Sequence, residues 1–200
     1  MGNREIIYDH YKDSFLLQRE NEKIRNKLFI EIIVTIAVLM MLTLFPNNFI
    51  NYFQQLILSI YEVDITIEIN ILEILIWFIL VYFTIKYFQI NSNIEKNYKY
   101  IYQLEETLNK KYKLAISREG KNYLNVYPQF LDYTYKFYKY IFPMLYIVIL
   151  IYKNILNVLN NGIFDFMSIV VLLVTILLIK LNISYINFNK KISEKEEKNG

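Results

Sequence analysis

Residues 28–45, LFIEIIVTIAVLMMLTLF, form an apolar run that is interrupted only by Glu31, Thr35 and Thr43. A helix needs roughly 20 apolar residues to cross a hydrocarbon core of about 30 Å, because it rises about 1.5 Å per residue. The run ends at Pro46, which is a natural stop for a helix. The 27 residues before it are charged and polar, so the run begins too deep for a cleaved signal peptide. The sequence therefore predicts a membrane anchor here.

Three further runs have comparable length and composition, at residues 69–88, 137–156 and 163–181. The run at 137–156 is the weakest because Pro143 and Lys153 interrupt it. We expect Pro143 to kink this helix, since proline removes one backbone hydrogen bond and crowds the preceding turn. We expect Lys153 to extend its ammonium group to the nearer membrane interface. The predicted fold class is an all-α polytopic membrane protein with four transmembrane helices.

Segments rich in Lys and Arg alternate along the chain with segments that lack them. Lys and Arg are frequent before the first span, absent from residues 46–68, frequent again between the second and third spans, and frequent in the tail. Cytoplasmic segments of membrane proteins carry an excess of Lys and Arg. Four crossings with both termini in the cytoplasm satisfy this rule, whereas three would leave one basic segment on the wrong side.

The segments between the spans complete a five-part organisation. We expect a cytoplasmic helix at 1–27, a transmembrane hairpin at 28–88, a cytoplasmic helix and elbow at 89–136, a second hairpin at 137–188, and a charged tail at 189–200. The first and second spans are both expected to continue into the cytoplasm as helices. Each rod carries an apolar stripe at helical spacing. The stripes consist of Tyr11, Phe15, Ile24 and Leu28 on the first rod, and of Ile90, Ile94, Ile101, Leu104 and Leu108 on the second. They can pack on each other or on neighbouring subunits. Outside, residues 51–61 are expected to form an amphipathic helix at the interface.

Catalytic groupings are missing from the sequence. There is no Cys, and the single histidine, His10, has no nucleophile in a recognisable frame. No Walker loop, metal-spaced cluster or nucleophile elbow is present. We therefore expect a protein that is not an enzyme and that needs no cofactor or metal.

Polar residues within the spans are the first candidate functional group, because their burial in a bilayer is costly. Those at helical spacing on the first and fourth spans are candidates for lining a pore: Glu31, Thr35, Thr43, Ser168, Thr175 and Asn182. In the second span, Glu73 and Thr84 share one face. The alternative is helix packing, in which small hydroxyl residues are common. A four-span subunit is too small to enclose much of a pore, so a channel requires a ring of subunits.

The elbow is the second candidate, because cations alternate with aromatic rings there. This combination suits the phosphates and bases of a nucleotide or a short single strand. Juxtamembrane basic residues that set topology and meet anionic lipid are the alternative. The candidate ligand-sensing residues are Lys110, Lys111, Lys113, Arg118, Lys121, Tyr112, Tyr123 and Tyr127.

The layout of spans and rods, with the segments YDHYKDSF at 8–15 and SREGKNYLNVYP at 117–128, resembles known membrane effectors. It is similar to the SLATT and SMODS-associated four-transmembrane families of bacterial nucleotide-signalled antiphage defence, including the Hailong-type channel effectors. The resemblance implies a homo-oligomeric pore in the bacterial inner membrane, a tetramer or larger. It also implies regulation by the oligonucleotide product of a partner nucleotidyltransferase, and depolarisation of the membrane during infection.

Two other functions are weighed against this one. A non-conducting scaffold would use the rods and elbow to anchor a soluble partner enzyme at the membrane. A small transporter subunit is disfavoured, because the sequence has no internal repeat and no pair of Gly-interrupted helices.

Overall fold

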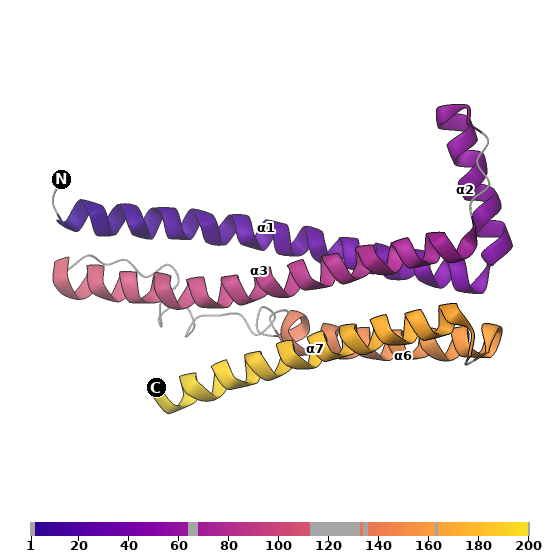
Figure 1. The fold of residues 1–200 in the computed structure, drawn as a ribbon. Coiled ribbons are helices and arrows are strands. Elements are labelled where there is room, and N and C mark those ends of the chain that lie inside the picture. Colours follow the sequence, from indigo (N-terminus) through magenta and orange to yellow (C-terminus); the bar gives the residue numbers. More distant parts are fainter. Residues whose placement is uncertain (1–2, 64–67, 113–132, 134–135, 163, 200) are drawn as a thin grey trace. The chain divides into compact units, whose positions relative to one another are not determined.

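The structure is a computed structural model that describes residues 3–63, 68–112, 133, 136–162 and 164–199. The described elements are helices: α1 (Asn3–Leu44), α2 (Pro46–Tyr61), α3 (Ile69–Tyr112), the π-helical turn η1 (Phe137–Ile141), α6 (Phe142–Asn161) and α7 (Phe166–Asn199). Figure 1 shows them along the chain. Four of these segments are long and apolar enough to cross a membrane, at Glu5–Leu44, Ile69–Tyr112, Phe137–Asn161 and Phe166–Lys190. The predicted all-α fold with four such helices is confirmed.

Two of the spans continue as helices far beyond bilayer length. α1 runs without a break from the charged N-terminal segment into the first apolar run, and α3 continues from the second run to Tyr112. The continuation of α1 is expected from the lack of Pro and Gly before Leu28, and that of α3 from the helical spacing of its apolar residues. α7 likewise continues past the fourth apolar run to Asn199.

Proline and capping residues set the boundaries between helices. α1 ends at Leu44, and Pro46 occupies the first turn of α2, where its missing N–H costs nothing. The amphipathic helix predicted at 51–61 therefore begins five residues earlier than expected, and Figure 1 shows it turning away from α1. α2 ends at Tyr61, and the next residue, Glu62, adopts a left-handed conformation with φ of 55°. Asp165 caps α7, because its Oδ2 accepts from the backbone N–H groups of Met167 at 2.9 Å and Ser168 at 3.3 Å.

Pro143 lies at the start of a helix and not within one. The five residues of η1 precede α6, and Pro143 occupies the first turn of α6. A π turn is a recognised way of accommodating a local irregularity in a helical run. The irregular part of this span is therefore the π-helical turn η1, which lies just before Pro143. The α-helix α6 then continues to Asn161.

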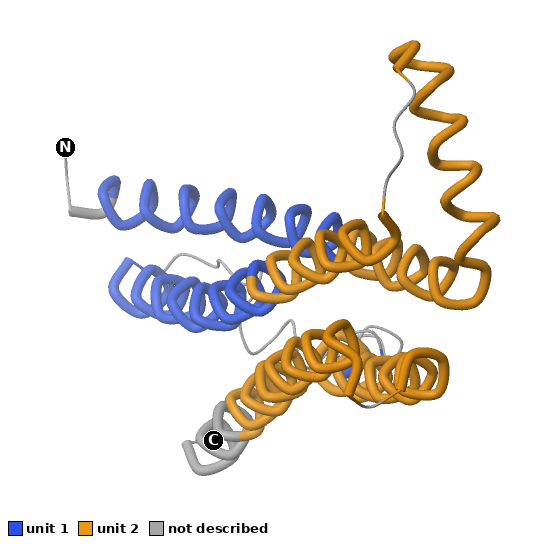
Figure 2. Tube along the Cα trace, turned by 45° about the vertical axis from the view of Figure 1, so that its right-hand side comes forward, with its two compact units in different colours: residues 1–29, 86–136 blue, residues 30–85, 137–200 orange. Residues whose placement is uncertain are grey.

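The chain divides into two compact units, which are coloured separately in Figure 2. Unit 1 comprises Met1–Phe29 and Lys86–Lys136, and unit 2 comprises Ile30–Ile85 and Phe137–Gly200. In unit 1, the N-terminal part of α1 packs on the C-terminal part of α3. Tyr11, Ile101 and Leu108 form its core, with Ile7, Leu104 and Tyr112 packed against them.

Hydrogen bonds fix the antiparallel register of unit 1. The Tyr11 hydroxyl donates to Glu105 Oε1 at 3.1 Å, and Tyr98 donates to Glu22 Oε1 at 2.7 Å. Asn97 Nδ2 donates to the Ser14 carbonyl at 2.9 Å and to Gln18 Oε1 at 3.0 Å. The two predicted stripes thus pack on each other within one chain. The prediction that Ile24 belongs to the first stripe is wrong, because its side chain is exposed.

In unit 2, apolar side chains face outward and the buried faces contain many polar ones. Exposed residues include Val34, Phe78, Val148 and Leu173, which are more than half exposed. Buried polar residues include Glu73, Thr84, Lys153, Asn157 and Thr175. Such an arrangement suits a lipid environment, in which apolar faces are solvated by acyl chains and polar groups find partners inside.

Candidate functional site: a polar seam in unit 2

The buried face of each long helix repeats every three or four residues. This average of 3.5 residues is the period of a left-handed coiled coil. On α7 the repeat places a polar residue at every seventh position, and all seven positions of the repeat are buried: Ser168, Val171, Thr175, Leu178, Asn182, Tyr185 and Asn189. On α3 the same repeat includes ten buried positions: Glu73, Trp77, Leu80, Thr84, Tyr87, Asn91, Ile94, Ile101, Glu105 and Leu108. We call the buried polar residues of unit 2 the polar seam.

A buried ion pair joins α3 to α6 in the polar seam. Lys153 Nζ lies 2.8 Å from Glu73 Oε1, and only 3% of the Lys153 side chain and 10% of the Glu73 side chain are exposed. Trp77 Nε1 also donates to Glu73 Oε1, at 3.4 Å. The expectation that Lys153 reaches out to the membrane interface is therefore wrong. A buried partner of opposite charge satisfies the ammonium group inside the protein, which removes the reason for it to reach outward.

Amides and hydroxyls join α6 to α7 near the same end of these helices. Asn157 Nδ2 donates to Ser168 Oγ at 3.3 Å, and Asn154 Nδ2 donates to Thr175 Oγ1 in a short hydrogen bond. Asn161 Nδ2 donates to Asn157 Oδ1 at 3.0 Å. The two hydrogen bonds between α6 and α7 fix the register of the second hairpin, because each amide meets its hydroxyl at only one vertical offset between the helices.

A second polar link joins α3 to α6 further along. The Thr84 hydroxyl lies 2.9 Å from the Tyr146 hydroxyl, and Thr84 Oγ1 also donates to the Leu80 carbonyl at 2.7 Å. Tyr146 is 1% exposed and Thr84 is fully buried. α3 and α6 are thus joined by polar contacts at two levels of the spans.

Asn154 Oδ1 and Asn182 Oδ1 in the polar seam have no hydrogen-bond partner among the described residues. Asn182 is fully buried, and its Nδ2 donates to the Leu178 carbonyl at 2.8 Å. A buried acceptor without a partner costs about 1–3 kcal/mol. Such groups are retained in membrane spans chiefly where they serve a purpose.

The predicted pore-lining residues fall into two groups. Ser168, Thr175 and Asn182 share a buried face of α7, as their spacing of seven predicts, and the first two contact α6. On α1, Thr35 and Thr43 donate to the carbonyls of Glu31 and Leu39, at 2.7 and 2.8 Å. Thr35 is buried, whereas Glu31 and Thr43 are half-buried. The contacts of Ser168 and Thr175 with α6 are those of helix packing.

Of the predicted ligand-sensing residues, three lie within the described part of the chain, at the end of α3. Lys110 pairs with Glu106 at 2.5 Å, and this hydrogen bond, with the carboxylate charge, raises the pKa of Lys110 above its ordinary value. Lys111 Nζ lies 5.7 Å from the centre of the Tyr112 ring, within the range of a cation–π contact. Lys113, Arg118, Lys121, Tyr123 and Tyr127 lie outside the described residues.

The residues that the sequence-based prediction missed are Asn154 and Asn157, together with the pairing of Glu73 and Lys153. A signal for them was present. Lys153, Asn154 and Asn157 are spaced so that they share one face of the third span, which directly precedes α7 in the chain. Glu73 is the only acidic residue of the second apolar run. Because an unpaired charge inside a membrane is costly, the two charges of opposite sign in adjacent spans are natural partners.

No family model, curated protein or solved structure matches this chain. Its class therefore follows from its own residues. Four apolar helices of spanning length, lipid-compatible outer faces and buried polar contacts describe an all-α multi-pass membrane protein.

Proposed function

We propose that the chain is the subunit of a homo-oligomeric ion channel that acts as a membrane effector in bacterial antiphage defence. Its proposed location is the bacterial inner membrane, with both termini and unit 1 in the cytoplasm. An oligonucleotide or nucleotide signal acts on the cytoplasmic side, and opening depolarises the membrane. The subunit needs no catalytic group or cofactor for this role.

The polar seam is the observation that carries this proposal. Ionisable and amide side chains inside membrane spans are expensive and commonly mark ion pathways. The seam contains an ion pair, hydroxyls, and two amide oxygens whose acceptor capacity is unused among the described residues. Carbonyl oxygens and hydroxyls are the groups that replace the hydration shell of an ion in a filter. Within one subunit these groups are packed together, so this arrangement is a closed state in the proposal.

Unit 1 and the elbow supply the proposed sensor. The exposed face of the two helices carries both signs of charge, while the end of α3 presents Lys110, Lys111 and Tyr112. A ligand that binds there more tightly in one conformation than in another shifts the population of the open state. Because α3 is one unbroken helix from Ile69 to Tyr112, its two ends belong to one element.

Ion flux from liposomes tests the proposal. Purified full-length protein in liposomes should release a trapped monovalent cation, and a short oligonucleotide should change the rate. Glu31→Gln should alter the preference between cations and anions, because a ring of carboxylates at a pore mouth favours cations. Thr107→Ala, at an exposed position of α3, is the control and should leave the flux unchanged. A protein that stays monomeric in mild detergent and never conducts contradicts the proposal.

A non-conducting scaffold for a soluble partner enzyme is the second candidate. The contacts of Ser168 and Thr175 with α6 favour it, because they give these hydroxyls a purely structural role. Substitution distinguishes the two functions. Glu31, Ser168 and Thr175 are replaced by Ala. Survival of the cellular function, with a partner that still co-purifies, would support the scaffold function and contradict the channel.

A further inference from the structure

Lys180 is an exposed cation on a part of α7 that lies outside the polar seam. Leu178 and Asn182, two residues before and after it, are buried, whereas Lys180 is exposed. No described residue forms an ion pair with it. The helix around it is apolar, so the lysine has a positive charge without a protein counter-charge among the described residues, within a segment of spanning composition.

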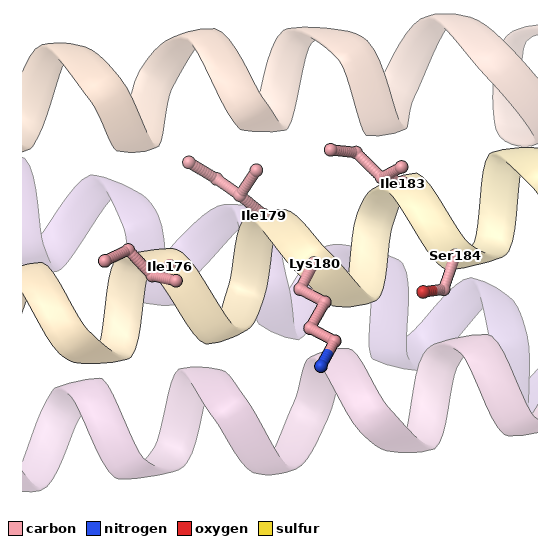
Figure 3. A pocket seen from close by; sticks show the side chains of 5 residues that line it. All are labelled: Ile176, Ile179, Lys180, Ile183 and Ser184. Carbon is pink, nitrogen blue, oxygen red and sulfur yellow. The ribbon is translucent and has the colours of Figure 1, made fainter.

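A shallow groove surrounds this lysine. It has a volume of about 300 Å³ and is lined by Ile176, Ile179, Lys180, Ile183 and Ser184. In Figure 3, Lys180 and Ser184 point to the lower side of α7, whereas Ile179 and Ile183 project from its upper side. One side of the groove thus offers an ammonium group and a hydroxyl one turn apart, and the other lining residues are aliphatic.

The backbone of Lys180 lies inside the hydrocarbon core, within reach of its boundary. α7 starts at Phe166, so Lys180 follows after 14 residues, which is about 21 Å of helix. A hydrocarbon core is about 30 Å thick, so the long lysine stem can bring its ammonium group close to the headgroup level. Lys190, an exposed residue of a type that favours the membrane interface, follows ten positions later.

We propose that this groove binds one anionic phospholipid. The lipid phosphate accepts hydrogen bonds from Lys180 Nζ and Ser184 Oγ, and an acyl chain lies along Ile176, Ile179 and Ile183. A lipid satisfies both halves of the groove, since it supplies a negative charge and an aliphatic chain in one molecule. Anionic headgroups are the general partners of basic residues at membrane surfaces.

Lipid retention measured by native mass spectrometry tests this site. The full-length protein is taken from nanodiscs made with equal amounts of phosphatidylglycerol and phosphatidylcholine. Wild type should retain phosphatidylglycerol preferentially. Lys180→Gln should lower this retention about five-fold, which is the effect of one lysine at an anionic surface. Ser184→Ala should lower it by a smaller factor. Both positions are exposed, so neither change disturbs the packed seam.

Lys86→Gln is the matched control, since Lys86 is an exposed lysine of α3 in the second apolar run. It should leave phosphatidylglycerol retention at the wild-type level. Equal retention in Lys180→Gln and wild type overturns the proposal, as does an equal loss in Lys86→Gln. Displacement of the lipid by millimolar inorganic phosphate would show a simple anion site instead. A photo-crosslinker at Ile179 that captures a second protein chain, and no lipid, would assign the groove to an interface between copies.

Discussion

Neutralising Glu73 should destabilise the protein more than neutralising Lys153, although the two residues form one ion pair. Removing one partner of a buried pair costs about 3–5 kcal/mol, because the other charge is left without compensation. The cost depends on how easily the remaining charge reaches water. In this protein the two residues differ in that respect, and the difference can be estimated from their positions along the helices.

Lys153 is the deeper charge of the two. It lies eight residues before Asn161, where α6 ends, which corresponds to about 12 Å of helix. In Glu73→Gln, the glutamine keeps an oxygen that accepts from Trp77 Nε1, so the variant removes the charge with little change of shape. The stranded Lys153 is 3% exposed and too deep to reach the nearer helix end without rearrangement. We expect a loss of about 3–5 kcal/mol in the free energy of unfolding.

Glu73 is better placed to remain alone. It follows Ile69, the first residue of α3, by four residues, or about 6 Å of helix. Lys153→Met should therefore cost less, about 1–3 kcal/mol, the scale of an unsatisfied buried polar group. The double variant Glu73→Gln/Lys153→Met should lie within about 1–2 kcal/mol of wild type, since no buried charge remains.

The assay is equilibrium unfolding in mixed micelles or steric trapping in bicelles, with all four members of the cycle. Lys86→Met removes one lysine charge from an exposed position and serves as the control, with an expected change below about 0.5 kcal/mol. Additive losses in the double variant would refute the reasoning, because they would show that the two charges are not coupled. A larger loss in Lys153→Met than in Glu73→Gln would refute the argument from depth.

Three further predictions concern register, capping and topology. Asn97→Ala should destabilise unit 1 by about 1–3 kcal/mol in a thermal melt, because it removes the donor to the buried Gln18, whereas Asn93→Ala at an exposed site of the same helix should have little effect. Asp165→Ala should cost about 0.5–2 kcal/mol by unfolding, since it removes the two cap hydrogen bonds of α7; an unchanged stability would show that the cap is dispensable. Because the chain has no Cys, single cysteines at Glu62 and Thr107 report topology in intact cells. An impermeant maleimide should label position 62 and not position 107, and the reverse pattern would contradict the proposed orientation.

Much of the fold was predictable because membrane spans leave a strong signal in the sequence. Residues 28–45 and 163–181 are apolar over a length that only a spanning helix explains easily, and α1 and α7 contain them. The continuation of α1 followed from uninterrupted helix formers, and that of α3 from the helical spacing of its apolar residues. The boundary of α2 was less predictable, because Pro46 both ends one helix and starts the next.

The candidate site was predicted only in part. The spacing of seven identified the face of Ser168, Thr175 and Asn182, since periodicity along one helix can be read directly. The partners on other helices could not be found in this way, because contacts between helices depend on their relative rotation and vertical offset. Lys153 shows the consequence most clearly. Considered alone, it was expected at the membrane interface, and it is instead buried against Glu73, 80 positions earlier in the chain.

The polar seam also explains how helices with such similar apolar surfaces choose one packing. In lipid, an apolar contact between helices gains little over a contact with acyl chains, so Leu and Ile alone specify neither rotation nor offset. Ile32 and Ile33 of α1 illustrate this, since one is fully buried and its neighbour is 45% exposed with the same chemistry. Polar groups do discriminate, because a wrong rotation leaves a charge or an amide in hydrocarbon. A movement that opens unit 2 must therefore separate Lys153 from Glu73 or carry both together. The double variant removes this constraint while preserving stability, so in liposomes it should conduct more readily than wild type if the pair holds the spans closed.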